Sequence, residues 1–242
     1  MRSFRAVAWD VDGTLVDSEP LHHRALLAGS LRWGVDLSDL PEQQFRGIHM
    51  ADVWAALRPR MPADLGPADW LAAINAYYIA NSGDLKPLPG VVQTVAALAA
   101  RGIPQVCVSN SNRPVVRANL AALGLSSYLA FAISLDDVSN GKPDPEPYLR
   151  VVERLQLQPN EVLAVEDSRA GVASAVAAGM TVALCADLPI EQPDLVTRVV
   201  DIAEILSSLA PTRSRSRRHR SGTGHSFRLM RRRRRRIPRV EG

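Results

Sequence analysis

Five short runs of apolar residues recur along the chain, and polar or turn-forming residues bound each of them. Short apolar runs bounded in this way are typical of strands buried on both faces of a sheet. The sequence therefore predicts buried strands at residues 4–9, 105–108, 129–133, 162–165 and 181–184.

The segments between most of these runs carry apolar residues at the three- and four-residue spacing of an α-helix. Val116, Leu120 and Leu123 form one such face. Asn112 is placed to cap the N-terminus of that helix, and Gly124 follows its end. Strands that alternate with helices predict an α/β fold with a Rossmann-like, largely parallel sheet. Further helical patterns occur at residues 91–100, 144–155 and 170–178.

Residues 17–86 interrupt this alternation. The segment has no convincing strand pattern, and it holds six of the twelve aromatic residues of the chain. We therefore expect an inserted helical cap at 17–86 and an α/β core made of residues 1–16 and 87–210. The two apolar helical faces predicted in the cap are Val53, Trp54 and Leu57, and Trp70, Ile74 and Tyr77.

The composition is that of a globular protein from a reducing compartment. Apolar residues make up 46% of the chain, which is enough to form a core over most of its length. The two cysteines, Cys107 and Cys185, lie in apolar runs, and so small a number excludes a disulfide framework. The apolar stretch near the N-terminus is too short for a signal peptide, and no apolar run reaches the length of a bilayer span. We expect a soluble, cytoplasmic protein without a membrane partner.

The charge is strongly segregated along the chain. Residues 211–242 contain 13 arginines and one acidic residue, a net charge of +12, whereas the rest of the chain has a net charge of −8. So dense a run of like charges with few apolar residues predicts a disordered, Arg-rich tail. Such a tail is either a solvated extension or an arm that binds polyanions weakly.

Polar and charged residues directly follow the predicted strands. Because ligands of a parallel α/β sheet bind at the carboxyl ends of its strands, these residues form the candidate site. Four acids there would repel one another without a cation, and an all-oxygen ligand set favours Mg²⁺ held together with a phosphate group. A lysine among them supplies the fixed positive charge that phosphoryl transfer needs. The residues are Asp10, Asp12, Ser109, Asn110, Lys142, Glu166 and Asp167.

Four segments resemble the ordered motifs of the haloacid dehalogenase-like hydrolase superfamily. The pattern is most similar to the branch of β-phosphoglucomutase-like sugar phosphatases, in which a helical cap is inserted after the first motif. The resemblance extends over residues 7–184. The segments are DVDGTLVD at 10–17, Ser-Asn at 109–110, GKPDP at 141–145 and VEDSRAG at 165–171.

The resemblance implies roles for the matching acids. Asp10 would be the nucleophile that forms an aspartyl-phosphate. Asp12 would protonate the leaving oxygen and later deprotonate the attacking water. Mg²⁺ would be held by the carboxylates of Asp10 and Asp167 and by the backbone carbonyl of Asp12, with Glu166 beside them.

The resemblance also implies residues that bind the phosphate group of the substrate. Ser109 and Lys142 would contact the phosphate oxygens, with Asn110 beside Ser109. Thr14 is a further candidate, although a hydroxyl directly after the Gly13 turn also serves to cap that turn.

His22 and Arg46 are the candidate substrate-binding residues of the cap. His22 stands where the mutase branch has a hinge-side histidine that assists proton transfer, although histidines also occur on plain helix surfaces. Arg46 lies near the cap loop that binds substrate in that branch. The arginine that mutases carry a few residues later has no counterpart, because Met50 follows His49 here.

These observations favour a Mg²⁺-dependent phosphatase that acts on a small phosphorylated metabolite, of the sugar phosphate or phosphoglycolate type. A phosphosugar mutase is the alternative, weakened by the missing cap arginine. A dehalogenase fits less well, because that chemistry does not use a second aspartate such as Asp12. A polyanion-binding protein acting through the tail is weaker still, since the body of the chain is acidic.

Overall fold

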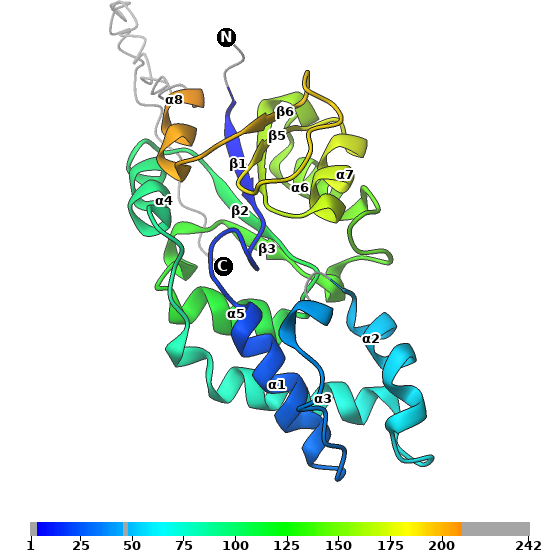
Figure 1. The fold of residues 1–242 in the computed structure, drawn as a ribbon. Helices are drawn as coiled ribbons and strands as arrows, with labels where there is room; N and C mark the ends of the chain where they lie inside the picture. The colour runs from blue at the N-terminus through cyan, green and yellow to red at the C-terminus, as the bar shows by residue number, and fades with distance from the viewer. Residues whose placement is uncertain (1–3, 46–47, 210–242) are drawn as a thin grey trace, which may run out of the picture. The chain divides into compact units, whose positions relative to one another are not determined.

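The computed structural model of the 242-residue chain describes residues 4–45 and 48–209. Two predictions therefore lie outside the described residues: the role of Arg46 and the Arg-rich tail at 211–242. Figure 1 shows the described elements, which begin with β1 and end with α8.

The centre of the structure is a six-stranded sheet whose neighbouring strands all run parallel, in the order β3-β2-β1-β4-β5-β6 (Figure 1). Val7 of β1 pairs with Gln105 of β2 on one side and with Leu163 of β4 on the other. The strand order reverses at this central strand, which is the point where sheets of this kind open a crevice for ligands. The strands are β1 Ala6–Trp9, β2 Gln105–Val108, β3 Phe131–Ile133, β4 Val162–Glu166, β5 Thr181–Leu184 and β6 Val196–Arg198.

All five strands predicted from the sequence are present, so the predicted α/β class with a parallel sheet is confirmed. The sixth strand, β6, was not predicted. Among its three residues only Val196 is buried, while Thr197 and Arg198 are exposed, so the strand has no apolar run. It forms through main-chain pairing with β5, because Val199 N donates to Leu184 O at 2.9 Å.

Helices pack against both faces of the sheet, because alternate residues of a strand point to opposite faces. Val7 and Trp9 belong to the apolar cluster that includes α4, α5 and α8, whereas Ala6 and Ala8 belong to the cluster that includes α6 and α7. The Trp9 indole donates a hydrogen bond to Gln105 Oε1 at 3.0 Å, so the N–H group of this buried side chain has a partner. These helices are α4 Val91–Ala100, α5 Arg113–Ala122, α6 Glu146–Leu155, α7 Arg169–Ala177 and α8 Ile205–Ser208.

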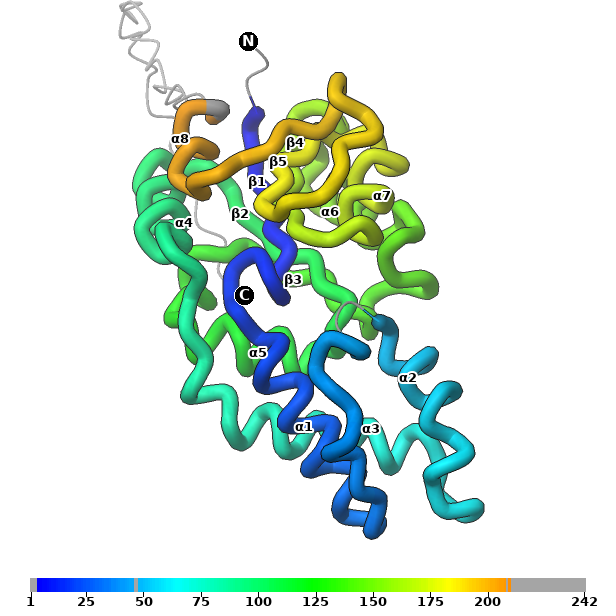
Figure 2. The backbone as a smooth tube through the Cα atoms, in the orientation of Figure 1, coloured from blue at the N-terminus to red at the C-terminus, as the bar shows by residue number. Residues whose placement is uncertain are grey.

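Between β1 and α4 the described residues form helices and loops. Figure 2 follows the chain from the end of β1 into α1 and, after α3, back to α4. The outgoing and returning connections lie side by side, since Leu88 N donates to Leu15 O at 3.0 Å. The limits of a cap domain at residues 17 and 86 stay a prediction. The elements are α1 Glu19–Leu31, α2 Met50–Leu57 and α3 Pro67–Ala80, with short 3-10 helices at Glu42–Gln44, Arg58–Arg60 and Ser82–Asp84.

The helices α1 and α3 approach each other closely at Gly29. A Cβ atom added there would lie 2.5 Å from Ile74 Cγ1 and 3.0 Å from Ile74 Cα. On α3 the buried face contains Trp70, Ile74 and Tyr78, whereas the predicted Tyr77 is partly exposed. Residues spaced by four follow the face of an α-helix, and Tyr78 continues that spacing from Ile74.

The two cysteines are free thiols, Cys107 in β2 and Cys185 directly after β5. Burial raises the pKa of both thiols, so they stay protonated and act as small apolar groups. Among the described residues, no helix combines the length and the apolar character that crossing a membrane requires.

We predict that Gly29→Val lowers the free energy of unfolding by about 1–3 kcal/mol, because the added side chain forces α1 and α3 apart. Urea denaturation measures this loss. Gly83→Val is the matched control, since a Cβ at Gly83 has no neighbour within 4 Å. The close packing of α1 on α3 would be disproved by equal stability of the two variants.

Candidate active site

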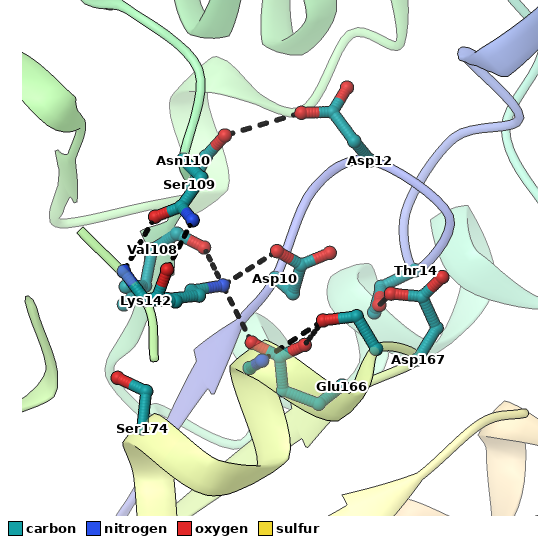
Figure 3. A network of polar contacts seen from close by, with 12 residues as sticks. Asp10, Asp12, Thr14, Val108, Ser109, Asn110, Lys142, Glu166, Asp167 and Ser174 are labelled. Atoms are coloured by element: carbon teal, nitrogen blue, oxygen red, sulfur yellow. Dashed lines mark hydrogen bonds and ion pairs between the residues drawn. The ribbon is translucent and has the colours of Figure 1, made fainter. Parts of the chain in front are cut away.

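The predicted site residues converge at the carboxyl edge of the sheet (Figure 3). Most of them come from the connections that follow β1, β2, β3 and β4, and Glu166 is the last residue of β4. Segments far apart in the sequence thus meet at the point where the strand order reverses. The residues brought together are Asp10, Asp12, Thr14, Ser109, Asn110, Lys142, Glu166 and Asp167.

The turn after β1 depends on Gly13. Its φ angle of 87° lies in the left-handed region, which residues other than glycine rarely adopt. A Cβ atom at this position would also clash with the carboxylate of Asp167. Thr14 Oγ1 donates to Asp167 Oδ1 at 3.4 Å, so the turn binds the residue that follows β4. The first and fourth motifs are therefore in contact at this turn.

Lys142 is buried with all three of its ammonium protons engaged. Nζ donates to Asp10 Oδ1 at 2.7 Å, to Val108 O at 2.8 Å and to Glu166 Oε1 at 2.6 Å. Burial alone would lower the pKa of Lys142, but Asp10 and Glu166 raise it above its usual value. The residue is therefore a fixed cation. For Lys142 to contact a substrate phosphate, as predicted, a phosphate oxygen would have to replace one of these three acceptors.

Glu166 is fully buried at the end of β4 and holds the base of the site together. Its Oε1 accepts from Lys142 and also from the Tyr148 hydroxyl at 2.6 Å, and Oε2 accepts from Ser168 Oγ at 3.3 Å. A Cβ at Gly171 would clash with this carboxylate, so the first turn of α7 must carry a glycine there. A helix was predicted at residues 144–155, but Tyr148, which lies in it, was assigned no role in the site. The tyrosine hydroxyl could have indicated a polar contact, since a buried tyrosine normally needs a hydrogen-bond partner.

Three carboxylates fit a divalent cation. Oxygen atoms of Asp10, Glu166 and Asp167 all lie within 4.8 Å of one another. In the described part of the chain, Asp10 Oδ2 is the one buried side-chain polar atom without a hydrogen-bond partner. Burial raises the pKa of Asp10 well above its ordinary value against the effect of Lys142, and burial together with Glu166 raises that of Asp167 to about 7. A hard cation bound by these oxygen atoms would reduce the repulsion between the three carboxylates.

Asp12 has a different environment, because five polar groups surround its carboxylate. His22 Nε2 on α1 lies 3.3 Å from Oδ1, and a contact of His22 with substrate stays a prediction. Burial alone would raise the pKa of Asp12, but hydrogen bonding to His22, Ser18 and Ser111 lowers it below its ordinary value. Hydrogen bonds reach Oδ1 from Ser18 Oγ at 2.7 Å and Asn119 Nδ2 at 3.0 Å, and Oδ2 from Ser109 Oγ at 3.2 Å and Ser111 Oγ at 3.0 Å.

Asn110 connects the loops that follow β2 and β3. Its side chain accepts from Lys142 N at 2.8 Å and donates to Lys142 O at 2.9 Å. His49, the residue before α2, places Nε2 2.9 Å from Asn110 Nδ2 and 3.1 Å from Lys142 O. The amide of Asn110 thus orients the lysine loop, a role that the predicted contact with phosphate did not include.

Sequence reasoning missed three further partners of Asp12, namely Ser18, Ser111 and Asn119. Ser18 directly follows the motif at 10–17, and Ser111 directly follows the motif at 109–110. Their place next to these motifs was the indication in the sequence that they could belong to the site. Asn119 is fully buried on the face of α5 that also carries Val115, Val116 and Leu120. A polar residue on an apolar helical face is a signal for a buried hydrogen-bond partner.

The model of the haloacid dehalogenase-like hydrolase family matches residues 4–179. Hexitol phosphatase A of Escherichia coli K12 is 32% identical over 204 residues, 83% of this chain and 89% of that protein. A phosphoglycolate phosphatase of Escherichia coli O157:H7 is 36% identical over 203 residues, 72% of this chain and 78% of that protein. The chain belongs to the haloacid dehalogenase-like hydrolase family, and the similarity to a hexitol phosphatase agrees with the predicted sugar-phosphatase-like branch.

A solved structure agrees with this assignment. CbbY from Rhodobacter sphaeroides, in complex with phosphate, superimposes with a TM-score of 0.74 at 25% sequence identity. The comparison covers 85% of this chain and 99% of that chain. The similarity therefore includes both the sheet and the helical segment inserted after β1.

We predict that Lys142→Met destabilises the fold by about 3–5 kcal/mol and abolishes activity, because Asp10 and Glu166 lose the cation between them. Chemical denaturation measures the first effect and phosphate release the second. Lys86→Met is the control, since the only other lysine of the chain is exposed. A Lys142→Met variant as stable as the control would contradict this account of the site.

Proposed function

We propose that the protein is a Mg²⁺-dependent phosphatase that hydrolyses a small phosphorylated metabolite through an aspartyl-phosphate on Asp10. The observation that carries the proposal is the environment of this buried carboxylate. Oδ1 is held by Lys142 at 2.7 Å, while Oδ2 is unpaired beside two further carboxylates. The names of the two relatives, a hexitol phosphatase and a phosphoglycolate phosphatase, support a small phosphate monoester as substrate.

The cation would be bound by the carboxylates of Asp10 and Asp167 and by the backbone carbonyl of Asp12, with Glu166 beside them. Mg²⁺ bound there would neutralise negative charge on the phosphate group and on the carboxylates together. Lys142 adds a positive charge that the protein itself fixes. Ser109, Asn110 and Thr14 are our candidates for contacts with the phosphate group, and His22 and Arg46 for contacts on the cap side.

In the first step Asp10 attacks phosphorus. A bond forms between a carboxylate oxygen of Asp10 and phosphorus, and the bond between phosphorus and the leaving oxygen breaks. The electron pair of that bond stays on the leaving oxygen, which takes a proton from Asp12. Lys142 keeps the Asp10 carboxylate in one orientation, which reduces the entropy cost of reaching the attacking geometry.

In the second step Asp12 acts as a base. Its carboxylate removes a proton from a water molecule, whose oxygen attacks phosphorus and releases Asp10 and inorganic phosphate. The proton that Asp12 gains is the one it donates to the leaving oxygen of the next substrate. The hydrogen bonds to Asp12 keep its carboxylate in the ionised form, which is the form that accepts a proton in this step.

A phosphosugar mutase from the same branch is the alternative function, and the contact of His22 with Asp12 is compatible with both. A mutase must hold a second phosphate group while the intermediate turns over, and Met50 stands where mutases carry an arginine for this purpose. A requirement for a sugar bisphosphate activator would identify a mutase. Release of inorganic phosphate without an activator would identify a phosphatase.

We predict that Asp10→Asn abolishes turnover while the fold stays intact, because the amide has nearly the same shape but is a poor nucleophile. Asp12→Asn should lower the rate about 10²–10⁴-fold through loss of the proton-transfer group. Phosphate release and thermal unfolding measure activity and fold. Wild-type turnover by Asp10→Asn would exclude the aspartyl-phosphate route.

We predict that hydrolysis of a panel of hexitol phosphates, hexose phosphates and phosphoglycolate requires Mg²⁺, stops with EDTA and returns with added Mg²⁺. Asp167→Ala should be nearly inactive, because it removes a hard anionic ligand. Asp84→Ala, which changes an exposed aspartate, is the control and should keep full activity. Hydrolysis by the purified protein in EDTA would rule out the metal requirement.

A further inference from the structure

A chain of buried hydrogen bonds joins α3 to Asp12 through α5. The Tyr78 hydroxyl on α3 donates to Asn119 Oδ1 at 2.8 Å, and Asn119 Nδ2 donates to Asp12 Oδ1 at 3.0 Å. Tyr78 and Asn119 are 1% and 0% exposed, so neither side chain has water as an alternative partner. Nothing in the proposed reaction uses these two residues directly.

Tyr78 also contacts a second partner of Asp12. Its ring lies 4.4 Å, centroid to centroid, from the ring of His22, whose Nε2 is 3.3 Å from Asp12 Oδ1. Two of the three groups around this oxygen, His22 and Asn119, are therefore held by one tyrosine. The third is Ser18 Oγ, which lies just before α1.

The hydroxyl of Tyr78 decides which way the amide of Asn119 faces. A side-chain amide has a donor end and an acceptor end of nearly the same shape, so its orientation depends on its partners. Because the tyrosine hydroxyl donates to Oδ1, Nδ2 is directed at Asp12, and the carboxylate receives a donor rather than another acceptor. Without the hydroxyl, both orientations of the amide become accessible.

We propose that Tyr78 and Asn119 are positioning residues that hold the Asp12 carboxylate for proton transfer, and that they couple helix α3 to the chemistry. This inference rests on the proposed function, because it assumes that Asp12 protonates the leaving oxygen. Asp12 lies in the connection after β1, and α3 and α5 support its carboxylate through Tyr78 and Asn119. The pair acts on the reaction only through Asp12.

A role in positioning Asp12 affects substrates differently from a role in stabilising the fold. A poor leaving group such as an alkyl alcohol needs a proton when its bond to phosphorus breaks, whereas p-nitrophenolate leaves without one. Loss of correct positioning at Asp12 should therefore reduce kcat/KM for an alkyl phosphate and leave that for p-nitrophenyl phosphate nearly unchanged. A variant with a disturbed fold would lose both to the same extent.

Tyr78→Phe is the main test, because it removes only the hydroxyl and keeps the ring against His22. We expect kcat/KM for phosphoglycolate or a hexitol phosphate, whichever the panel shows to be hydrolysed, to fall about 5–10-fold, the rate equivalent of one hydrogen bond. The value for p-nitrophenyl phosphate should stay within about 2-fold. Tyr77→Phe is the matched control, since it makes the same change one residue earlier on α3 at a partly exposed position. It should change neither value.

Asn119→Leu is the second variant, because it removes both hydrogen bonds at nearly constant volume. Its kcat/KM for the alkyl phosphate should fall further than that of Tyr78→Phe, while its kcat/KM for p-nitrophenyl phosphate should again stay nearly unchanged. In an Asp12→Asn background, Tyr78→Phe should have less than about a 2-fold further effect, since residues acting through one group are not additive. Equal losses on both substrates, or a full additional loss in that background, would overturn the proposal.

Asp12→Asn on the same two substrates separates this inference from the proposed function. A strong loss on the alkyl phosphate alone supports Asp12 as the acid, and the Tyr78 and Asn119 variants then test positioning. If Asp12→Asn shows no difference between the substrates, the proposed role of Asp12 fails and the positioning role fails with it. If Asp12→Asn shows the difference and Tyr78→Phe does not, only the positioning role is wrong.

Discussion

The site depends on one buried cation, the ammonium group of Lys142. It lies between Asp10 and Glu166 at 2.7 and 2.6 Å, and its third proton is bound by the carbonyl of Val108. Without it, two carboxylates would face each other in a region with almost no water, at a cost of several kcal/mol. β1, β2, β4 and the loop after β3 must therefore arrive in one fixed arrangement, because each supplies a group to this cation or the residue that carries it.

Asp10 and Asp12 are two residues apart, yet the fold gives them opposite environments. Burial and neighbouring acids raise the pKa of Asp10, which fits a carboxylate that shares its charge with a cation. Five polar groups surround Asp12, and hydrogen bonds from His22, Ser18 and Ser111 lower its pKa although burial opposes them. Two identical side chains whose environments separate their properties can take two chemical roles, here nucleophile and proton carrier.

Much of the core could be predicted from the sequence, because its strands are buried on both faces. Residues 105–108 and 181–184 form strands with the predicted limits, and Asn112 caps α5 as expected, since Oδ1 accepts from Val115 N. β6 was missed, because its stability comes from pairing with β5 and not from apolar residues of its own. Tyr77 was predicted on the buried face where Tyr78 lies, because the sequence pattern of α3 is apolar nearly all round.

The sequence by itself determined which chemical groups the site contains, because the motifs combine functional residues with glycines that leave room for them. Gly13 beside Asp12 and Gly171 after Glu166 are examples, since both positions exclude a side chain. Only the tertiary structure decided how those groups are paired. Lys142 binds carboxylates that are 132 and 24 residues away along the chain, and Asn119 reaches Asp12 across 107 residues. Such contacts follow from helix packing and strand order, which local periodicity does not encode.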